Sequence, residues 1–273
     1  MRSVNPTNDL AFRKVFGSSE NIHILAGLIK DFFFIEPTGL AIENPYSIKS
    51  YKELLKDQEV FRLRQTISDI AATMQWADYR SELQVRKDNF YDERSLYYPL
   101  NRFVSRYRVV PGDDSAYARL RPIYALNILG YKHFPDDEDA LRIFKLYDPV
   151  RNKVYRKDLL NLGYFELLKT NVETDNQRDW QNYFLQKSLS AMAPDYIREA
   201  LHIIDLSNME EEELAVVEQI DYYRSIYDGQ LAYAKDEGKI EMILEMLRDN
   251  VPIDTIMKYS GFTKKQIDEL KPV

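Results

Sequence analysis

The stretch TISDIAATMQWADYRSELQVR, residues 66–86, decides the fold predicted for this chain. Two short runs of alternating polarity flank what reads as a hairpin bend, a pattern typical of two antiparallel strands. Successive side chains of a strand point to opposite faces, so Glu82 and Gln84 share one face of the second strand. With Asp69 on the neighbouring strand, these side chains can converge on one metal ion. The hairpin is therefore the candidate site of the chain.

Length and composition indicate a folded chain with a substantial core, because 45% of its 273 residues are hydrophobic. No apolar run approaches the roughly 20 residues that a membrane span needs, and the first residues lack the apolar centre of a secretory signal. We therefore expect a soluble, cytoplasmic protein. The chain has no cysteine, which excludes disulfides and thiolate metal sites, so oxygen or imidazole must hold any metal.

The net charge of -7 argues at first sight against a nucleic-acid partner, because lysine and arginine make most phosphate contacts. The charge is unevenly distributed along the chain. Residues 51–133 carry 14 basic and 11 acidic side chains, whereas residues 195–273 carry 9 basic and 18 acidic ones. The block that holds the hairpin is thus mildly basic, which fits either a nucleic-acid surface or an ordinary solvated surface.

Turn and cap residues predict the elements around the hairpin. Residues 7–16 read as a helix capped by Thr7 or Asn8 and ended by Gly17. A second helix follows, with Ser19 as its cap and a broad apolar stripe suited to packing on a sheet. Further strands are predicted at residues 40–43, 123–131, 140–148 and 162–169. The acidic run 136–139 lacks the interval of a calcium loop and reads as a solvated turn.

Residues 88–110 predict a helix with Asp88 as its cap and Pro99 as a kink or an early stop. This is the most basic segment of the chain, and its arginines alternate with tyrosines. Such a surface can bind phosphates and stack on bases. Of the two interpretations, the pattern favours a helix whose tyrosines pack on the sheet while its arginines reach water.

From about residue 177 onward, the hydrophobic period changes from 2 to 3.6, which predicts an all-helical C-terminal region. The last stretch predicts a helix over residues 253–259, a turn at Gly261 and a helix capped by Thr263. This arrangement resembles a helix-turn-helix. Because its surroundings are acidic, a packing module is favoured over a DNA-binding one.

Familiar catalytic motifs are absent from the chain. It contains neither GxGxxG nor GxxxxGK[ST], and the three histidines, His23, His133 and His202, read as structural or surface residues. A hard ion such as Mg²⁺ prefers oxygen ligands, which the carboxylates of Asp69 and Glu82 and the backbone carbonyl of Leu83 can supply. The spacing alone does not separate such a site from an ordinary exposed strand.

Longer sequence words in a consistent order add to this evidence. They are NDLAFRKVFGSSENIHILAGLIKDF, the pairing of ISDI with SELQ, DERSLYY, IYALNILGY and FELLK. Together, over residues 5–170, they resemble the nuclease-like transposase family of the PD-(D/E)XK superfamily, also described as recombination-promoting nucleases. The tail AKDEGKIEMILEMLRDNVPIDTIMKYSGFTKKQIDEL is similar to the C-terminal portion of such proteins.

The resemblance implies an α/β fold with a restriction-endonuclease-like core, in which a mixed β-sheet is flanked by helices. An all-helical C-terminal region would follow it. On this basis we expect a nuclease-like domain over residues 1–170, a helical extension over 171–235 and a small helix-turn-helix-like tail over 236–273.

The same resemblance implies roles for individual residues. By position, Asp69 matches the first acid of the family motif, Glu82 the second, and Gln84 the place where the superfamily most often has lysine. Glutamine brings no positive charge, so it would orient the attacking water through neutral hydrogen bonds. Candidates for auxiliary metal, phosphate or DNA contacts are Asp9, Lys14, Arg94 and Tyr98, which can equally cap and pack helices.

The implied activity is Mg²⁺-dependent cleavage of DNA phosphodiesters by an endonuclease of transposase or recombination-promoting type, with Mn²⁺ as a substitute metal. The neutral Gln84 and the acidic tail leave an alternative open: a catalytically weak or inactive nuclease fold that acts as a DNA-binding or protein-interaction factor. RNA as the substrate also stays open. Cutting both strands needs two active sites or a rearrangement, so a homodimer is one option.

Overall fold

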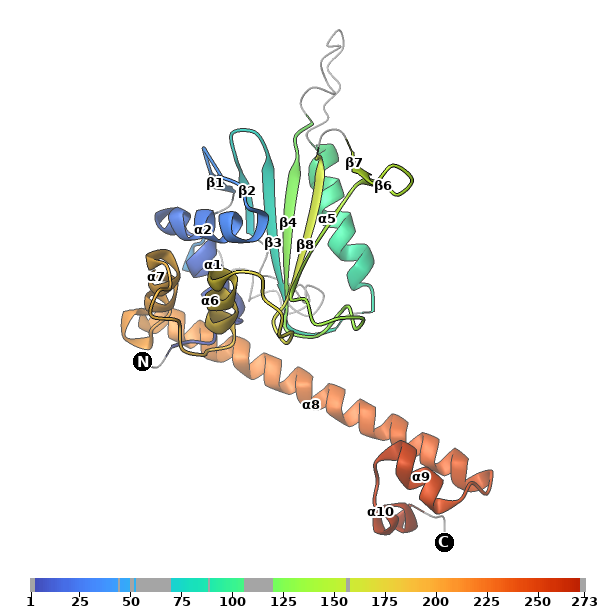
Figure 1. Ribbon diagram of the computed structural model, residues 1–273. Helices are drawn as coiled ribbons and strands as arrows, with labels where there is room; N and C mark the ends of the chain where they lie inside the picture. Colours follow the sequence, from blue (N-terminus) through green and yellow to red (C-terminus); the bar gives the residue numbers. More distant parts are fainter. Residues whose placement is uncertain are drawn as a thin grey trace. The chain divides into compact units, whose positions relative to one another are not determined.

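The computed structural model describes residues 3–43, 45–49, 52, 70–87, 89–105, 120–155 and 158–270. Its centre is a six-stranded sheet in the order β1-β2-β3-β4-β8-β5 (Figure 1). The strands are β1 (Ala41–Glu43), β2 (Ile70–Thr73), β3 (Asp78–Gln84), β4 (Ile123–Leu129), β5 (Leu141–Lys145) and β8 (Leu160–Glu166). The central strands β3, β4 and β8 run parallel, and the outer pairings are antiparallel. The predicted mixed α/β sheet is confirmed.

Helices surround this sheet and form the C-terminal part of the chain. They are α1 (Asp9–Phe16), α2 (Ile22–Phe33), α5 (Tyr91–Ser105), α6 (Asp175–Phe184), α7 (Asp195–Ile203), α8 (Glu211–Arg248), α9 (Ile253–Ser260) and α10 (Lys264–Glu269). A small separate hairpin is formed by β6 (Tyr147–Asp148) and β7 (Lys153–Val154). None of the helices in the described ranges is both long enough and apolar enough to cross a membrane.

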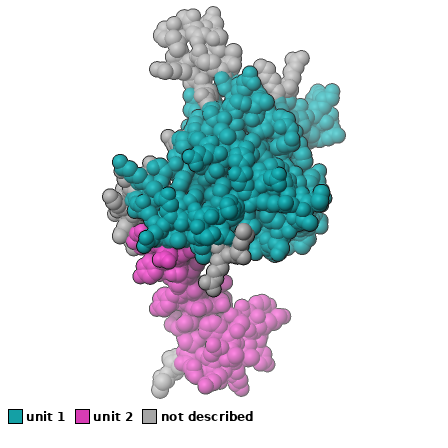
Figure 2. Space-filling model, turned by 90° about the vertical axis from the view of Figure 1, so that its left-hand side faces the viewer, with its two compact units in different colours: residues 1–217 teal, residues 218–273 magenta. Residues whose placement is uncertain are grey.

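The chain divides into two compact units, residues 1–217 and residues 218–273, which Figure 2 distinguishes by colour. The first unit contains the sheet together with α1, α2, α5, α6 and α7. The second unit contains most of α8 and the pair α9 and α10. The boundaries predicted at 170/171 and 235/236 stay predictions.

Helix α2 covers one face of the sheet, and α5 lies on the other side (Figure 1). Phe33 of α2 meets Tyr124 of β4 edge to face, with ring centroids 5.2 Å apart. Gly163 of β8 lies beneath the same ring, and a Cβ atom there would come within 3.1 Å of Phe33. The glycine therefore allows the helix to approach the sheet closely.

The α5 face of the sheet has its own apolar cluster, which is centred on aromatic side chains. Its buried members are Tyr91, Ala125, Leu129, Tyr131, Leu162 and Tyr164. The helix runs past Pro99 to Ser105, which excludes the early stop, one of the two effects predicted for Pro99. Asp88, the predicted cap, lies outside the described residues.

Helix termini follow the sequence signals in most places. Asn8 caps α1, since its side chain accepts a hydrogen bond of 3.0 Å from the amide of Leu10, and Gly17 ends the helix as predicted. Ser19 does not cap α2. It begins a short 3₁₀ helix, Ser19–Asn21, because the chain tightens into one 3₁₀ turn before α2 starts.

The second unit packs around three buried isoleucines: Ile243 of α8, Ile256 of α9 and Ile267 of α10. Gly261 adopts a φ of 75° between α9 and α10, which ends the first of these helices. Thr263 forms a capping box with Gln266 at the start of α10. The predicted two-helix arrangement is confirmed.

Candidate active site

The predicted site lies on β3, an interior strand of the sheet. Its neighbours are β2 on one side and β4 on the other. Glu82 and Gln84 come near the carboxyl end of this strand and are each 3% exposed. In open α/β sheets, ligands bind beyond the carboxyl ends of the parallel strands. Both side chains are thus at the edge where such sites form.

Arg94 of α5 joins the two residues. Its Nη2 atom donates a hydrogen bond of 2.8 Å to Gln84 Oε1 and lies 3.2 Å from Glu82 Oε1. Gln84 Nε2 in turn donates to the backbone carbonyl of Arg86 at 2.7 Å. The carbonyl oxygen of the Gln84 amide is therefore turned toward the guanidinium, and Arg94 is the positive charge beside the buried Glu82.

Parallel register aligns further polar groups with Glu82. Glu82 pairs with Asn127 of β4, and Asn127 pairs with Tyr164 of β8. Asn127 Nδ2 donates to the carbonyl of Gly163 at 3.1 Å, and the Tyr164 hydroxyl lies 2.8 Å from Ser95 Oγ. Burial raises the pKa of Tyr164, so its hydroxyl stays protonated at neutral pH.

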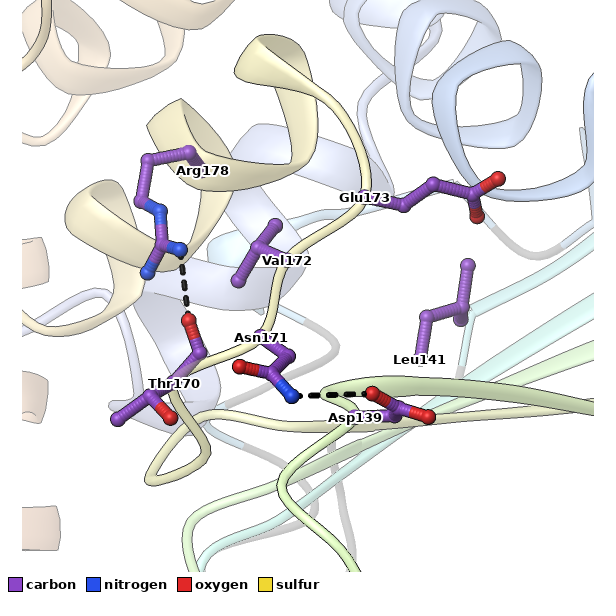
Figure 3. A pocket seen from close by; sticks show the side chains of 7 residues that line it. All are labelled: Asp139, Leu141, Thr170, Asn171, Val172, Glu173 and Arg178. Atoms are coloured by element: carbon purple, nitrogen blue, oxygen red, sulfur yellow. Dashed lines mark hydrogen bonds between the residues drawn. The ribbon is translucent and has the colours of Figure 1, made fainter.

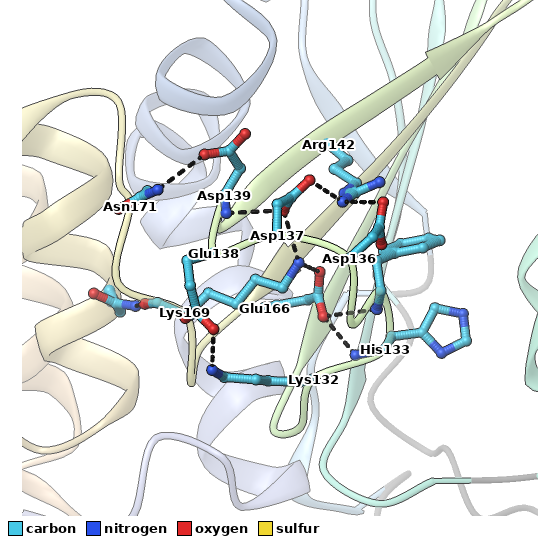
Figure 4. A network of polar contacts seen from close by, with 12 residues as sticks. Lys132, His133, Asp136, Asp137, Glu138, Asp139, Arg142, Glu166, Lys169 and Asn171 are labelled. Atoms are coloured by element: carbon cyan, nitrogen blue, oxygen red, sulfur yellow. Dashed lines mark hydrogen bonds and ion pairs between the residues drawn. The ribbon is translucent and has the colours of Figure 1, made fainter.

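A second polar network follows the carboxyl ends of β4 and β8 (Figure 4). Lys169 Nζ lies 2.9 Å from Glu166 Oε2 and 3.2 Å from Asp137 Oδ1, and the Lys169 and Glu166 side chains are fully buried. Glu166 Oε1 also accepts hydrogen bonds from the backbone amides of His133 and Phe134. This network anchors the loop after β4.

The acidic residues of that loop are engaged with basic partners. Arg142 pairs with both Asp136 and Asp137, and Lys132 pairs with Glu138. Pro135 and Asp136 form a turn, as the sequence predicts. A hydrogen bond from Arg142 lowers the pKa of Asp137 to about 2. The loop is therefore a network of ion pairs.

A hollow of about 570 Å³ lies between the start of β5 and the segment that leads into α6, and Figure 3 shows its lining. Asn171 Nδ2 donates to Asp139 Oδ1 at 3.2 Å, and Arg178 Nη2 donates to the carbonyl of Thr170 at 2.7 Å. These groups bind one another, and the hollow includes none of the predicted site residues.

Asp69 lies outside the described residues. The following residue, Ile70, begins β2 and pairs with Ser81, which directly precedes Glu82. Leu83, whose carbonyl is a predicted metal ligand, is buried between Glu82 and Gln84 and pairs with Ile128 of β4.

The auxiliary candidates have different surroundings. Arg94 joins the Glu82 and Gln84 pair, and Tyr98 stacks against Arg80 of β3, with the guanidinium 4.5 Å from the ring centroid. Lys14 instead forms an ion pair with Glu213 at the start of α8. Asp9 occupies the first turn of α1, where an acidic side chain stabilises the helix dipole.

Comparison with protein families gives one match that spans most of the chain. Residues 6–232 match the family described as PD-(D/E)XK nuclease family transposase. The chain belongs to this family. No curated protein and no solved structure matches it.

The candidate ligand atoms on β3 are of one chemical kind. Glu82, the Leu83 carbonyl and Gln84 offer only oxygen as ligand atoms on one short segment, which suits a hard divalent cation. In the ranges that the structure describes, no group of three or more histidine, aspartate or glutamate side chains is close enough to hold a metal. Asp69, a member of the predicted ligand set, lies outside those ranges.

Several polar residues of this nuclease-family fold escaped the sequence interpretation. Asn127, Tyr164, Glu166 and Lys169 lie in segments that the sequence marks only as strands. The FELLK word contains Glu166 and Lys169 three residues apart, which was the available signal. Tyr91 stood out only as one of the tyrosines that alternate with arginines in its segment.

Proposed function

We propose that this chain is a metal-dependent DNA endonuclease of transposase or recombination-promoting type. One observation carries the proposal: Glu82 and Gln84 share a face at the carboxyl end of β3, joined by Arg94, in a chain of the PD-(D/E)XK nuclease family transposases. In this proposal, Asp69, Glu82 and the Leu83 carbonyl hold Mg²⁺ or Mn²⁺. The pairing of Ile70 with Ser81, the residue before Glu82, supports Asp69 as the first acid of the motif, because Asp69 directly precedes Ile70 in the chain.

When bound, the metal supplies an acidified water and stabilises charge on the leaving oxygen. The protein residues do the rest. Glu82 presents a carboxylate held in place by burial and by Arg94. Arg94 and the Arg86 carbonyl hold the two ends of the Gln84 amide. The fixed amide can then orient a water molecule through its second N–H group, without adding charge. Arg94 provides the positive charge that Gln84 lacks and can stabilise a phosphate.

A cleavage assay on supercoiled plasmid DNA in Mg²⁺ or Mn²⁺ tests the proposal. The parent should nick or linearise the plasmid, and Asp69→Ala and Glu82→Ala should each lose most of that activity. Asp175→Ala, at the first turn of α6, is a control that keeps the proposed ligands and should cleave like the parent. Equal cleavage by the parent and the Glu82 variant would refute the site.

The second candidate function is a DNA-binding or protein-interaction factor without cleavage. The ion pair of Arg94 with Glu82 favours it, because such a pair can be purely structural in a fold that has lost its chemistry. This candidate predicts that the parent binds a DNA duplex but leaves it intact in Mg²⁺ and in Mn²⁺.

A further inference from the structure

Tyr91 has a feature that packing does not explain. It is the first residue of α5 and is 2% exposed. Its hydroxyl is buried and makes no hydrogen bond within the part of the chain that the structure describes. Burying a hydroxyl without a partner is destabilising, and native structures contain few such groups. A phenylalanine would fill the same space without this cost.

The surroundings of Tyr91 place it at the candidate site. The guanidinium of Arg94 lies over its ring at 5.5 Å from the centroid, and the same guanidinium contacts Glu82 and Gln84. The tyrosine ring and the Glu82 carboxylate thus flank one cation. On its other side the ring packs edge to face against His133, with centroids 5.6 Å apart.

The chemistry of the hydroxyl is that of a donor. Burial raises the pKa of Tyr91 well above its usual value, and among nearby charges that of Glu82 contributes most to the rise. The hydroxyl therefore keeps its proton at neutral pH. A neutral donor in a poorly hydrated site binds an anionic oxygen more strongly than it does in water.

We propose that Tyr91 is a catalytic residue whose hydroxyl donates a hydrogen bond to a non-bridging oxygen of the DNA phosphodiester. The inference rests on the proposed function, since it names a substrate contact of the same site. The Arg94 guanidinium contacts Glu82, Gln84 and the ring of Tyr91, so all three side chains surround one cation that can bind a phosphate. Tyr91 and Arg94 then contact the phosphate from one helix, opposite the oxygen ligands of β3.

Tyr183 offers a matched control for Tyr91. Tyr183 of α6 is 1% exposed, and its hydroxyl also lacks a hydrogen bond in the described residues. It packs among Phe16, Trp180 and Phe184, none of which is a predicted site residue. Tyr183→Phe therefore removes the same atom from an equally buried place that has no proposed ligand.

The experiment compares Tyr91→Phe and Tyr183→Phe in the full chain by three measurements: melting temperature, binding of a short DNA duplex in Ca²⁺, and plasmid cleavage in Mg²⁺. Tyr91→Phe should melt at or above the parent temperature yet cleave roughly 100-fold more slowly, as expected for loss of one donor to a developing oxyanion. It should also bind the duplex several-fold more weakly. Tyr183→Phe should melt at or above the parent temperature and keep both activities.

The outcomes separate this inference from the proposed function. Parental binding and cleavage by Tyr91→Phe would overturn the role of Tyr91, as would a melting temperature that falls only in that variant. If the parent binds the duplex without cleaving it, the endonuclease proposal fails, and weaker binding by Tyr91→Phe still supports the phosphate contact. If the parent does not bind the duplex, both proposals fail.

Discussion

Arg94 of α5 lies 3.2 Å from Glu82 of β3, so the predicted catalytic acid has a cation from a different element beside it. The pair links the helix on one face of the sheet to the carboxyl end of a central strand. A charge as buried as that of Glu82 needs such a partner. Arg94 also places a positive charge next to Gln84, the motif position at which this chain has a neutral residue.

The Arg94 and Glu82 pair predicts a measurable coupling. Arg94→Ala should lower the free energy of unfolding by about 2 kcal/mol, because it removes the cation that lies beside a buried carboxylate. In a Glu82→Gln background, Arg94→Ala should lower the free energy of unfolding by about half as much, because it leaves no buried carboxylate without a cation. Urea denaturation of the four proteins measures this cycle. Equal costs in the two backgrounds would show that the pair contributes no coupling.

Metal binding is predicted to require Glu82. The parent should melt at a higher temperature with increasing Mn²⁺, because a ligand that binds only the folded state stabilises it. Glu82→Ala should lose this dependence on Mn²⁺. Glu173→Ala, which removes an acid that lines the separate hollow near β5, should keep it. A Glu82 variant stabilised by Mn²⁺ as strongly as the parent would place the metal elsewhere.

The loop after β4 predicts part of the acid sensitivity of the fold. A hydrogen bond from Arg142 lowers the pKa of Asp137 from 3.8 to about 2. A lowered pKa in the folded state contributes stability above pH 3.8 that is lost as the pH falls toward 2. The free energy of unfolding should therefore decrease less steeply across this window in Asp137→Asn. Urea titrations at pH 4, 3 and about 2 measure it, and identical pH slopes would contradict the assignment.

Asp31 is predicted to hold three helices together. Its carboxylate accepts hydrogen bonds from Asn176 Nδ2 at 2.8 Å, Trp180 Nε1 at 2.9 Å and the Tyr196 hydroxyl at 2.8 Å. Asp31→Ala should lower the free energy of unfolding by about 3 kcal/mol, because buried donors on α6 and α7 lose their acceptor. Thermal and urea denaturation measure it. Glu36→Ala, which removes an exposed partner of Lys30, should melt like the parent.

The second unit is predicted to depend on Ile256. This side chain is fully buried between Ile243 and Ile267, so Ile256→Ala should cost about 3 kcal/mol of local stability. Hydrogen exchange should then accelerate in residues 218–273 and stay slow in the central strands. Tyr259→Ala, at an exposed position of the same helix, should leave exchange unchanged. Faster exchange in β4 after Ile256→Ala would mean that the two units unfold together.

Local sequence patterns were sufficient for most of the secondary structure. The alternation in residues 70–84 predicted β2 and β3, and the apolar run at residues 123–131 predicted β4 as a buried central strand. Gly17 and Thr263 marked a helix end and a helix start correctly. These features depend on neighbours in the chain, which a sequence displays directly. Ser19 misled, because packing overrides the propensity of single residues, whereas Pro99 lies inside a helix that the sequence predicted.

The contacts of the site depend on residues far apart in the chain. The register of β3, β4 and β8 brings Asn127 and Tyr164 into line with Glu82, and shifting one strand by one residue would turn these side chains to the other face. A sequence read alone does not specify which residues face each other across parallel strands. Glu166 and Lys169 are close in the chain, but the contacts that bury them come from His133, Phe134 and Asp137 in the loop after β4, which a local pattern does not display.

The sequence by itself determined that Glu82 and Gln84 share a face, because side chains alternate with a period of two along any strand, and its longer words indicated the nuclease family. Only the tertiary structure decided which side chains contact Glu82 and Gln84. Arg94 reaches Glu82 and Gln84, and the ring of Tyr91 lies against the same guanidinium, because α5 packs against the sheet. A buried charge requires a partner, but which side chain supplies it is decided by how the helix packs on the sheet.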